Sequence, residues 1–291
     1  MNKRSTGEKV FNIFNVMFMI FFSFITVYPF IYALAYSLSS PAEAIRGGIT
    51  FFPRGFTFEN YRLVFARNDI YGAVVISVLR TVVGIGAHLF VCGLAAYGIS
   101  DERMPFCKPI TLFLVLQMYL TAGMIPTYIL MSRLHLMNSF WVYILPASYG
   151  GFDLILFRTN FRSIPVSLCE AARIDGASDI TIFAKIILPL SKSIIAIMAL
   201  FVGVWQWNSW FDAMLYITNA KLHPLAMLLQ RIIQQNEISD AGMLLEVGPR
   251  QISPESIKMA MLIITTVPII MIYPFFQRYF VKGIMVGAVK G

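Results

Sequence analysis

The segment EAARIDGASDITIFAKIILP, residues 170–189, is rich in charge, although 13% of the chain's 291 residues are charged and 58% are hydrophobic. Its apolar residues recur three or four positions apart, which is the period of an amphipathic helix. Gly176 interrupts this pattern, and a residue without a Cβ permits a sharp bend. Pro189 stands where a new helix can start. We therefore predict two short helices at an angle to each other that meet at Gly176, with Pro189 preceding the next span.

The composition is that of a membrane protein. The mean hydropathy is +0.71, and 25 Phe and 16 Met are more apolar side chains than one soluble core of this size buries. A membrane-spanning helix needs about 20 apolar residues. Six stretches are long enough: Val10–Leu38, Val74–Ser100, Pro109–Met131, Ser139–Phe157, Ser193–Tyr216 and Met259–Phe280. We predict an all-α, polytopic membrane protein with six transmembrane helices. Residues 1–291 form a single transmembrane domain, in which an N-terminal span (10–38) precedes the core spans (about 74–280).

Basic residues flank the predicted spans unevenly. They are denser near the N-terminus, in 101–108, in 158–192 and near the C-terminus than in the opposite loops. Because Lys and Arg concentrate in cytoplasmic flanks, we predict that both termini and the segment 170–189 are cytoplasmic. The net charge of +8 then needs no nucleic-acid partner, since a positive rim beside anionic lipid accounts for it.

Several kinds of site have no support in the sequence. The three Cys and three His residues show no metal-ligand spacing, so we expect no metal site. No G-x-x-x-x-G-K-[ST] motif occurs, so the chain is not expected to hold nucleotide phosphates. We also find no G-x-S-x-G elbow. We predict no catalytic residues, and a membrane enzyme or channel that acts alone is kept as an alternative.

The segment 170–189 has two interpretations as an amphipathic element at the membrane surface. A helix that binds lipid usually has a basic polar face, whereas Glu170, Asp175 and Asp179 place acids on this one. The mixed charge favours a protein partner over a lipid surface.

The residues of this segment resemble a known motif. Glu170-Ala171-Ala172, Gly176, Ile186 and Leu188-Pro189 are similar, position for position, to the EAA loop of binding-protein-dependent ABC transporter permeases. Other segments resemble the carbohydrate-uptake permeases, in particular the subfamily associated with aldouronates and alginate-like oligosaccharides. They are WQWNSWFDAMLYI (205–217), HPLAMLLQ (223–230), SIKMAMLII (256–264) and YPFFQRYFVKGIMVGAVKG (273–291). The resemblance covers nearly the whole chain.

The resemblance implies a permease subunit of an ATP-driven importer, forming half of the pore for a sugar or oligosaccharide; a non-sugar solute is the alternative. The EAA loop would be the coupling helix that docks in a cytoplasmic ATPase of two domains, which binds the ATP and Mg. A second homologous permease subunit and an extracytoplasmic sugar-binding protein would complete the assembly in the bacterial plasma (inner) membrane. The implied coupling residues are Glu170, Ala171, Ala172, Asp175, Gly176, Ile186, Leu188 and Pro189.

The fifth stretch combines tryptophans with polar residues. Aromatic faces suit sugar rings, and Asn208 and Asp212, one helical turn apart, are expected to share a face that bonds hydroxyls. An aromatic belt at the headgroups explains the tryptophans, but a lipid-facing carboxylate is costly; alternatively, the polar pair bonds a neighbouring helix. The candidate substrate-pathway residues are Trp205, Trp207, Asn208, Trp210, Phe211 and Asp212. The stretch differs from the fifth span of the maltose permease, so that protein's sugar contacts are not carried over.

Other polar residues within the spans have simpler interpretations. We expect Arg80 to snorkel to the outer interface, with a functional role as the alternative. We expect Asp153 to pair with Arg158, with a face toward a neighbouring subunit as the alternative. His88 and Gln117 are expected to bond neighbouring helices rather than a ligand.

Two connections between spans receive no specific assignment. The turn that contains Asp101 and Arg103 has the composition of an ordinary solvated loop, and we assign no site there. The segment 39–69 is rich in Gly, Pro and aromatic residues. It is either an interfacial anchor or, by resemblance, a contact for the binding protein.

Overall fold

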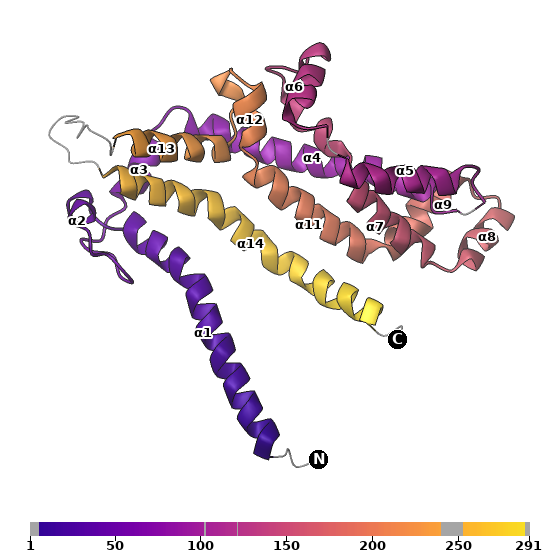
Figure 1. Ribbon diagram of the computed structural model, residues 1–291, viewed down its shortest axis with the longest axis horizontal. Coiled ribbons are helices and arrows are strands. Elements are labelled where there is room, and N and C mark those ends of the chain that lie inside the picture. Colours follow the sequence, from indigo (N-terminus) through magenta and orange to yellow (C-terminus); the bar gives the residue numbers. More distant parts are fainter. Residues whose placement is uncertain (1–5, 102, 121, 240–252, 289–291) are drawn as a thin grey trace. The chain divides into compact units, whose positions relative to one another are not determined.

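Three of the predicted spans are long unbroken helices. The computed structural model describes residues 6–101, 103–120, 122–239 and 253–288, and within these it has helices and loops but no β-strand. The helices α1 (Thr6–Ser37), α4 (Ile70–Gly98) and α14 (Pro254–Ala288) are long and apolar enough to cross a bilayer (Figure 1). They confirm the first, second and sixth stretches as helices. Residues 1–5 and 289–291, the ends that we predict to be cytoplasmic, lie outside the described residues.

The other three predicted spans are divided by breaks. The third consists of α5 (Cys107–Tyr119) and α6 (Met124–Arg133). The fourth consists of the 3-10 helices η1 (Phe140–Tyr143) and η2 (Pro146–Ser148), then α7 (Gly151–Arg162) after a 48° bend. The fifth consists of α11 (Lys192–Asn208) and α12 (Phe211–Tyr216). The described residues thus hold three spanning helices, or up to six if each bent pair is one span; the third bent pair in this count is Asp179–Leu190 with Lys192–Asn208.

A glycine and a proline lie at or near two of these breaks. Gly123, directly before α6, has a φ of 81°, a left-handed conformation that glycine adopts without a steric penalty. Pro146 begins η2, where its missing N–H removes no helical hydrogen bond. The predicted spans over 109–131 and 139–157 are therefore pairs of helices joined at a break rather than unbroken helices.

One compact unit comprises the described parts of residues 1–68 and 231–267. In it the segment 39–69 forms α2 (Pro41–Arg46) and α3 (Glu59–Phe65). The Tyr36 hydroxyl donates to the Ala44 carbonyl at 2.8 Å, and Asn60 Nδ2 donates to the carbonyls of Ser37 and Ser39 at 2.8 and 2.9 Å. These bonds fold the segment back onto the end of α1.

The second unit comprises residues 69–230 and the described part of 268–291. Within it α7 and α11 pack against α4 (Figure 1). The approach of α11 is close, since a Cβ added to Gly84 would lie 2.5 Å from Gln206 Nε2, and small residues permit such contacts between membrane helices. An apolar cluster fills the space between these helices: Cys92, Ala96, Leu154, Phe157 and Met198. The helices η4 (Ala220–Leu222) and α13 (Leu225–Ser239) follow α12.

Candidate functional site

The predicted bend at Gly176 is confirmed. The helix α8 (Val166–Ile174) ends in the hydrogen bonds of a Schellman motif: Gly176 N donates to Arg173 O at 3.0 Å and Ala177 N to Ala172 O at 2.9 Å. Gly176 has a φ of 84°, as the left-handed position after such a helix requires. Ser178 then accepts a bond from Thr181 N and caps α9 (Asp179–Ile182). Two adjacent caps therefore fix a sharp corner between two short helices.

The chain beyond α9 does not enter the next span directly. It continues through a π-helix, η3 (Phe183–Ile187), and α10 (Leu188–Leu190), and it turns by 82° only between Leu190 and Lys192. A proline ring in a helix clashes with the carbonyl four residues earlier. The wider turn of the π-helix, in which Leu188 N donates to Phe183 O, accommodates Pro189. The next span thus begins at Lys192, within one residue of the predicted start at Ser193, and Pro189 precedes it as predicted, within the short helix α10.

The eight predicted coupling residues divide by exposure. Glu170, Ala171, Asp175, Gly176 and Pro189 are exposed, whereas Ala172, Ile186 and Leu188 are half-buried. Ala172 and Ile186 pack on the apolar cluster around Phe161 and Ile182. Two large apolar residues beside the corner are strongly exposed, Ile174 at 87% and Ile180 at 76%. The segment thus offers a surface of mixed charge with exposed isoleucines, which is suited to a protein cleft.

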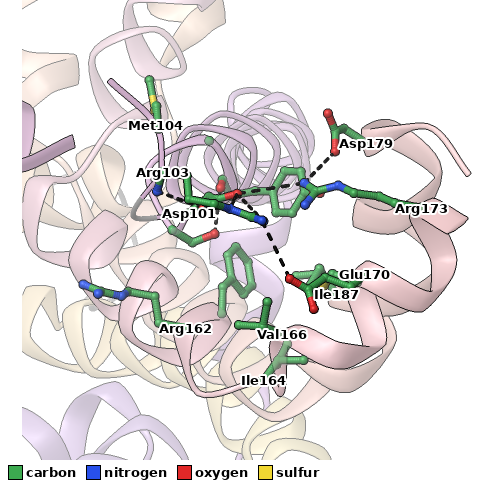
Figure 2. A pocket seen from close by; sticks show the side chains of 15 residues that line it. Asp101, Arg103, Met104, Arg162, Ile164, Val166, Glu170, Arg173, Asp179 and Ile187 are labelled. Carbon is green, nitrogen blue, oxygen red and sulfur yellow. Dashed lines mark hydrogen bonds and ion pairs between the residues drawn. The ribbon is translucent and has the colours of Figure 1, made fainter. Parts of the chain in front are cut away.

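An open pocket of about 830 Å³ lies between α8 and the turn that follows α4 (Figure 2). Asp101 and Arg103 of this turn point toward Glu170 and Arg173 of α8 (Figure 2). Arg103 Nη1 lies 3.7 Å from Glu170 Oε1, and Arg173 Nη2 lies 4.0 Å from Asp101 Oδ2 and 3.0 Å from Asp179 Oδ1. The interpretation of this turn as an ordinary solvated loop missed these contacts.

Hydrogen bonds from Arg103 hold the pKa of Asp101 below its usual range. A carboxyl group with a lowered pKa in the folded state stabilises that state above its ordinary pKa, and the stabilisation is lost as the pH falls through the lowered value. The carboxylate therefore stays ionised at neutral pH.

Arg80 lies in the interior of the second unit. Its side chain is fully buried and pairs with the Asp212 carboxylate of α12. It also donates from Nε to Gln206 Oε1 at 3.1 Å and from Nη1 to the Ser209 carbonyl at 3.0 Å, and its guanidinium carbon lies 4.2 Å from the centre of the Tyr143 ring. The expectation that Arg80 snorkels is wrong, because a partner for its charge is inside the protein.

This arrangement separates the predicted pair in the fifth span. Asn208 ends α11 and donates to its own helix, at Val204 O, whereas Asp212 lies in the first turn of α12 and accepts from Arg80, Ser209 and Ala213. The expected shared face of Asn208 and Asp212 is therefore wrong, and the alternative bond to a neighbouring helix holds for Asp212.

The aromatic residues of the fifth span have mixed exposure. Trp205 is 54% and Phe211 46% exposed, and Asn208 is also exposed, while Trp207 and Trp210 are half-buried. A role in the substrate pathway stays a prediction for these residues.

The remaining polar residues of the spans bond between elements. His88 Nε2 lies 3.1 Å from Asp153 Oδ2 and His88 Nδ1 lies 2.8 Å from the Ala147 carbonyl, and Gln117 accepts from the Tyr149 hydroxyl at 2.7 Å. The expectation for His88 and Gln117 is confirmed. The pairing of Asp153 with Arg158 is wrong, because Arg158 instead donates to the Ile99 carbonyl at 2.9 Å. Among the described residues no group of three or more His, Cys, Asp or Glu is placed to bind a metal.

Valine at Gly176 is expected to disrupt the corner between α8 and α9. The φ of 84° is strained for a β-branched residue by about 1–3 kcal/mol. We expect the exposed Ile174 and Ile180 to shift relative to each other. A partner that is bound to both should then be lost in co-purification. Gly176→Asn should retain binding, since asparagine tolerates this conformation. Gly72→Val, which has open space and no positive φ, is the control; equal binding by Gly176→Val and wild type would show that the corner is dispensable.

Comparisons with known proteins extend over the whole chain. No family model matches it. The polygalacturonan/rhamnogalacturonan transport system permease protein YtcP of Bacillus subtilis (strain 168) is 36% identical over 288 residues, covering 98% of this chain and 99% of that protein. Protein LplC of the same organism is 35% identical over 284 residues, covering 97% and 96%. A chain of a bacterial ABC transporter involved in the import of the acidic polysaccharide alginate has 29% identity and a TM-score of 0.87, covering 96% of this chain and 100% of that one.

Proposed function

This chain belongs to the family of sugar and oligosaccharide ABC importer permeases, and we propose that it forms one half of a pore for a saccharide delivered by an extracytoplasmic binding protein. It is a membrane subunit of a transporter and not an enzyme. One observation in the structure carries the proposal: an exposed short helix, α8, ends at a capped corner at Gly176. A partner that binds this helix can displace it, and the displacement can be transmitted to the spans.

The partner at α8 is proposed to be a cytoplasmic ATPase with two domains. In this proposal, that subunit binds ATP and Mg, and the hydrolysis of ATP drives the cycle. The mixed charges and exposed isoleucines of the corner support a protein contact rather than a lipid surface. Both termini of the chain are proposed to lie on the same, cytoplasmic side of the bacterial plasma (inner) membrane, on the basis of the Lys and Arg bias.

A second, homologous permease subunit is proposed to complete the pore. The most apolar 18-residue stretch of α1 has no buried residue. An apolar surface of this size must be covered by lipid or by another subunit. In the assembled importer, closure of the ATPase would move the coupling helices of both permeases, and the spans would rock between inward and outward openings.

The proposed cargo is a sugar or oligosaccharide. The exposed aromatic rings of Trp205 and Phe211 suit the apolar faces of sugar rings, and Asn208 beside them offers hydrogen bonds to hydroxyl groups. Because Asp212 is engaged by Arg80, we place the proposed sugar contacts on the exposed residues rather than on this carboxylate.

Reversing the charge of Glu170 is expected to weaken the contact with the ATPase. Glu170→Lys places a cation at the docking face, where like charges are costly if the ATPase presents a basic partner. We expect co-purification of the ATPase and the ATP hydrolysis stimulated by the binding protein to fall together. Glu8→Lys makes the same charge reversal at an exposed position in the first turn of α1 and should leave both measurements near wild type. Normal assembly and saccharide uptake by Glu170→Lys would refute the coupling assignment.

A further inference from the structure

The turn after α4 and the coupling helix α8 are joined by a chain of charges that alternate in sign. Glu170, Arg103, Asp101, Arg173 and Asp179 follow one another along this chain, with separations of 3.7, 3.0, 4.0 and 3.0 Å between successive charged atoms (Figure 2). Each arginine therefore lies between two carboxylates. The chain connects three segments: the end of span two, α8 and the start of α9.

Hydrogen bonds fix the side chain of Arg103 against Asp101. Asp101 Oδ1 accepts from the backbone N–H of Arg103 at 2.9 Å, and the Asp101 carboxylate accepts from Arg103 Nε and Nη2, each at 3.0 Å. A planar guanidinium bound in this bidentate way has a fixed direction. Its remaining nitrogen, Nη1, is the one that lies nearest Glu170. At the base of the turn the Ile99 carbonyl accepts from Arg158 of α7.

The coupling helix packs on the apolar cluster through Cys169 and Ala172. It joins α7 through the short segment before Val166 and joins α9 through the corner at Gly176. Neither of these two chain connections leads directly to α4. The contacts with Asp101 and Arg103 supply a direct link from α8 to the end of α4.

We propose that Arg103, oriented by Asp101, is a positioning residue that ties the coupling helix to the end of span two, so that movement of α8 reaches α4 directly. The inference rests on the proposed function, since it assigns the tie to the coupling step of the importer. Exposed ion pairs contribute little to folding stability, and Arg103 is 61% exposed. The contacts of Arg103 should therefore affect how movement of α8 is transmitted to α4 rather than the stability of the fold.

The test is Arg103→Ala in the complete complex of both permeases, the ATPase and the binding protein, reconstituted in liposomes. We expect the ATPase to co-purify as in wild type, while the number of saccharide molecules imported per ATP hydrolysed falls by about threefold or more. Arg103→Lys, which keeps the charge without the bidentate fork, should recover part of the loss. Lys108→Ala, an exposed cation of the same connection that does not line the pocket, should retain the wild-type ratio.

Salt concentration gives an independent prediction. Salt screens exposed charges. As the salt concentration rises, the number of saccharide molecules that the wild type imports per ATP should therefore fall toward the value for Arg103→Ala. The value for the variant itself should change little. A wild-type ratio in Arg103→Ala would overturn the proposal. So would loss of the ATPase from that variant, because Arg103 would then be a contact for the ATPase instead.

A measurement on the permease alone separates this inference from the proposed function. Spin labels at Lys108→Cys and Ile174→Cys, in a chain with Cys169→Ser and with the buried Cys92 and Cys107 retained, report the separation of the turn and α8 in lipid nanodiscs. Removal of Arg103 should broaden the distribution of distances between the labels. An unchanged distribution would overturn the tie even if the importer transports a saccharide, and a broadened one would uphold it even if the cargo is another solute.

Discussion

Alanine in place of Asp212 is expected to destabilise the permease by about 3–5 kcal/mol, because it leaves a buried charge without its partner. Arg80 is fully buried, and its remaining contacts are the neutral Gln206 side chain, the Ser209 carbonyl and the Tyr143 ring. None of these neutralises a guanidinium. Thermal unfolding of the purified chain in detergent micelles should show a lower midpoint for Asp212→Ala.

Two comparisons distinguish the loss of a charge partner from a general effect of truncation. The double variant Arg80→Met with Asp212→Leu removes both charges and keeps apolar volume, so it should recover most of the lost stability. Glu255→Ala removes a carboxylate that is paired with Lys258 near the surface at 3.5 Å, and it should change stability by less than about 1 kcal/mol. Wild-type stability of Asp212→Ala would mean that another group compensates Arg80.

The same pair explains the break in the fifth span. The break lies at Ser209 and Trp210, so neither glycine nor proline forms it. Ser209 has an extended backbone between α11 and α12, and an interrupted helix leaves carbonyls without partners. Arg80 donates to the Ser209 carbonyl, and Asp212 accepts from Ser209 Oγ and Ala213 N. An unwound segment inside a membrane protein is tolerated where buried groups satisfy it in this way.

Long-range pairing marks the limit of what the sequence predicts. Hydropathy and motif spacing are local properties, so they predict α1, α4, α14 and the corner at Gly176. Arg80 and Asp212 are separated by 132 positions, and each alone has the pattern of a costly charge in a span. Only the packing of α4 against α11 and α12 brings them together. The snorkelling interpretation of Arg80 was wrong because it considered one helix at a time.

The turn at Asp101 and Arg103 shows the same limit at the candidate site. Its charges have the composition of any solvated loop, and its contact with α8 depends on where α7 returns the chain. Gly123 and Pro146, which lie at or near the breaks in the third and fourth spans, were apparent from the sequence. Their effect on helix direction was not, because proline and glycine also occur inside continuous membrane helices, as Pro268 and Pro274 do in α14.

Alanine at Phe183 is expected to have the second largest effect. Phe183 is the first residue of the π-helix η3, and its ring packs on Tyr97 of α4 at 5.1 Å and on Phe161 of α7 at 6.3 Å between centroids. Removing a core phenylalanine costs about 3–5 kcal/mol. Because Phe183 is half-buried, we expect a loss near the lower limit, about 3 kcal/mol, measured by the same thermal unfolding.

Import per ATP should fall by more than the loss of stability explains, because these ring contacts connect the coupling segment to two spans. Through these ring contacts, a displacement of α8 and α9 reaches Tyr97 of α4 and Phe161 of α7 while the Phe183 ring fills the space between them. Packed interiors transmit such displacements, whereas a cavity absorbs them. We therefore expect Phe183→Ala, measured at a temperature where it remains folded, to hydrolyse ATP with reduced import per ATP. Phe183→Leu, which keeps most of the volume, should restore part of that ratio. If the alanine variant imports with the wild-type ratio, movement must reach the spans by another route, and the charged tie at Arg103 becomes the main candidate.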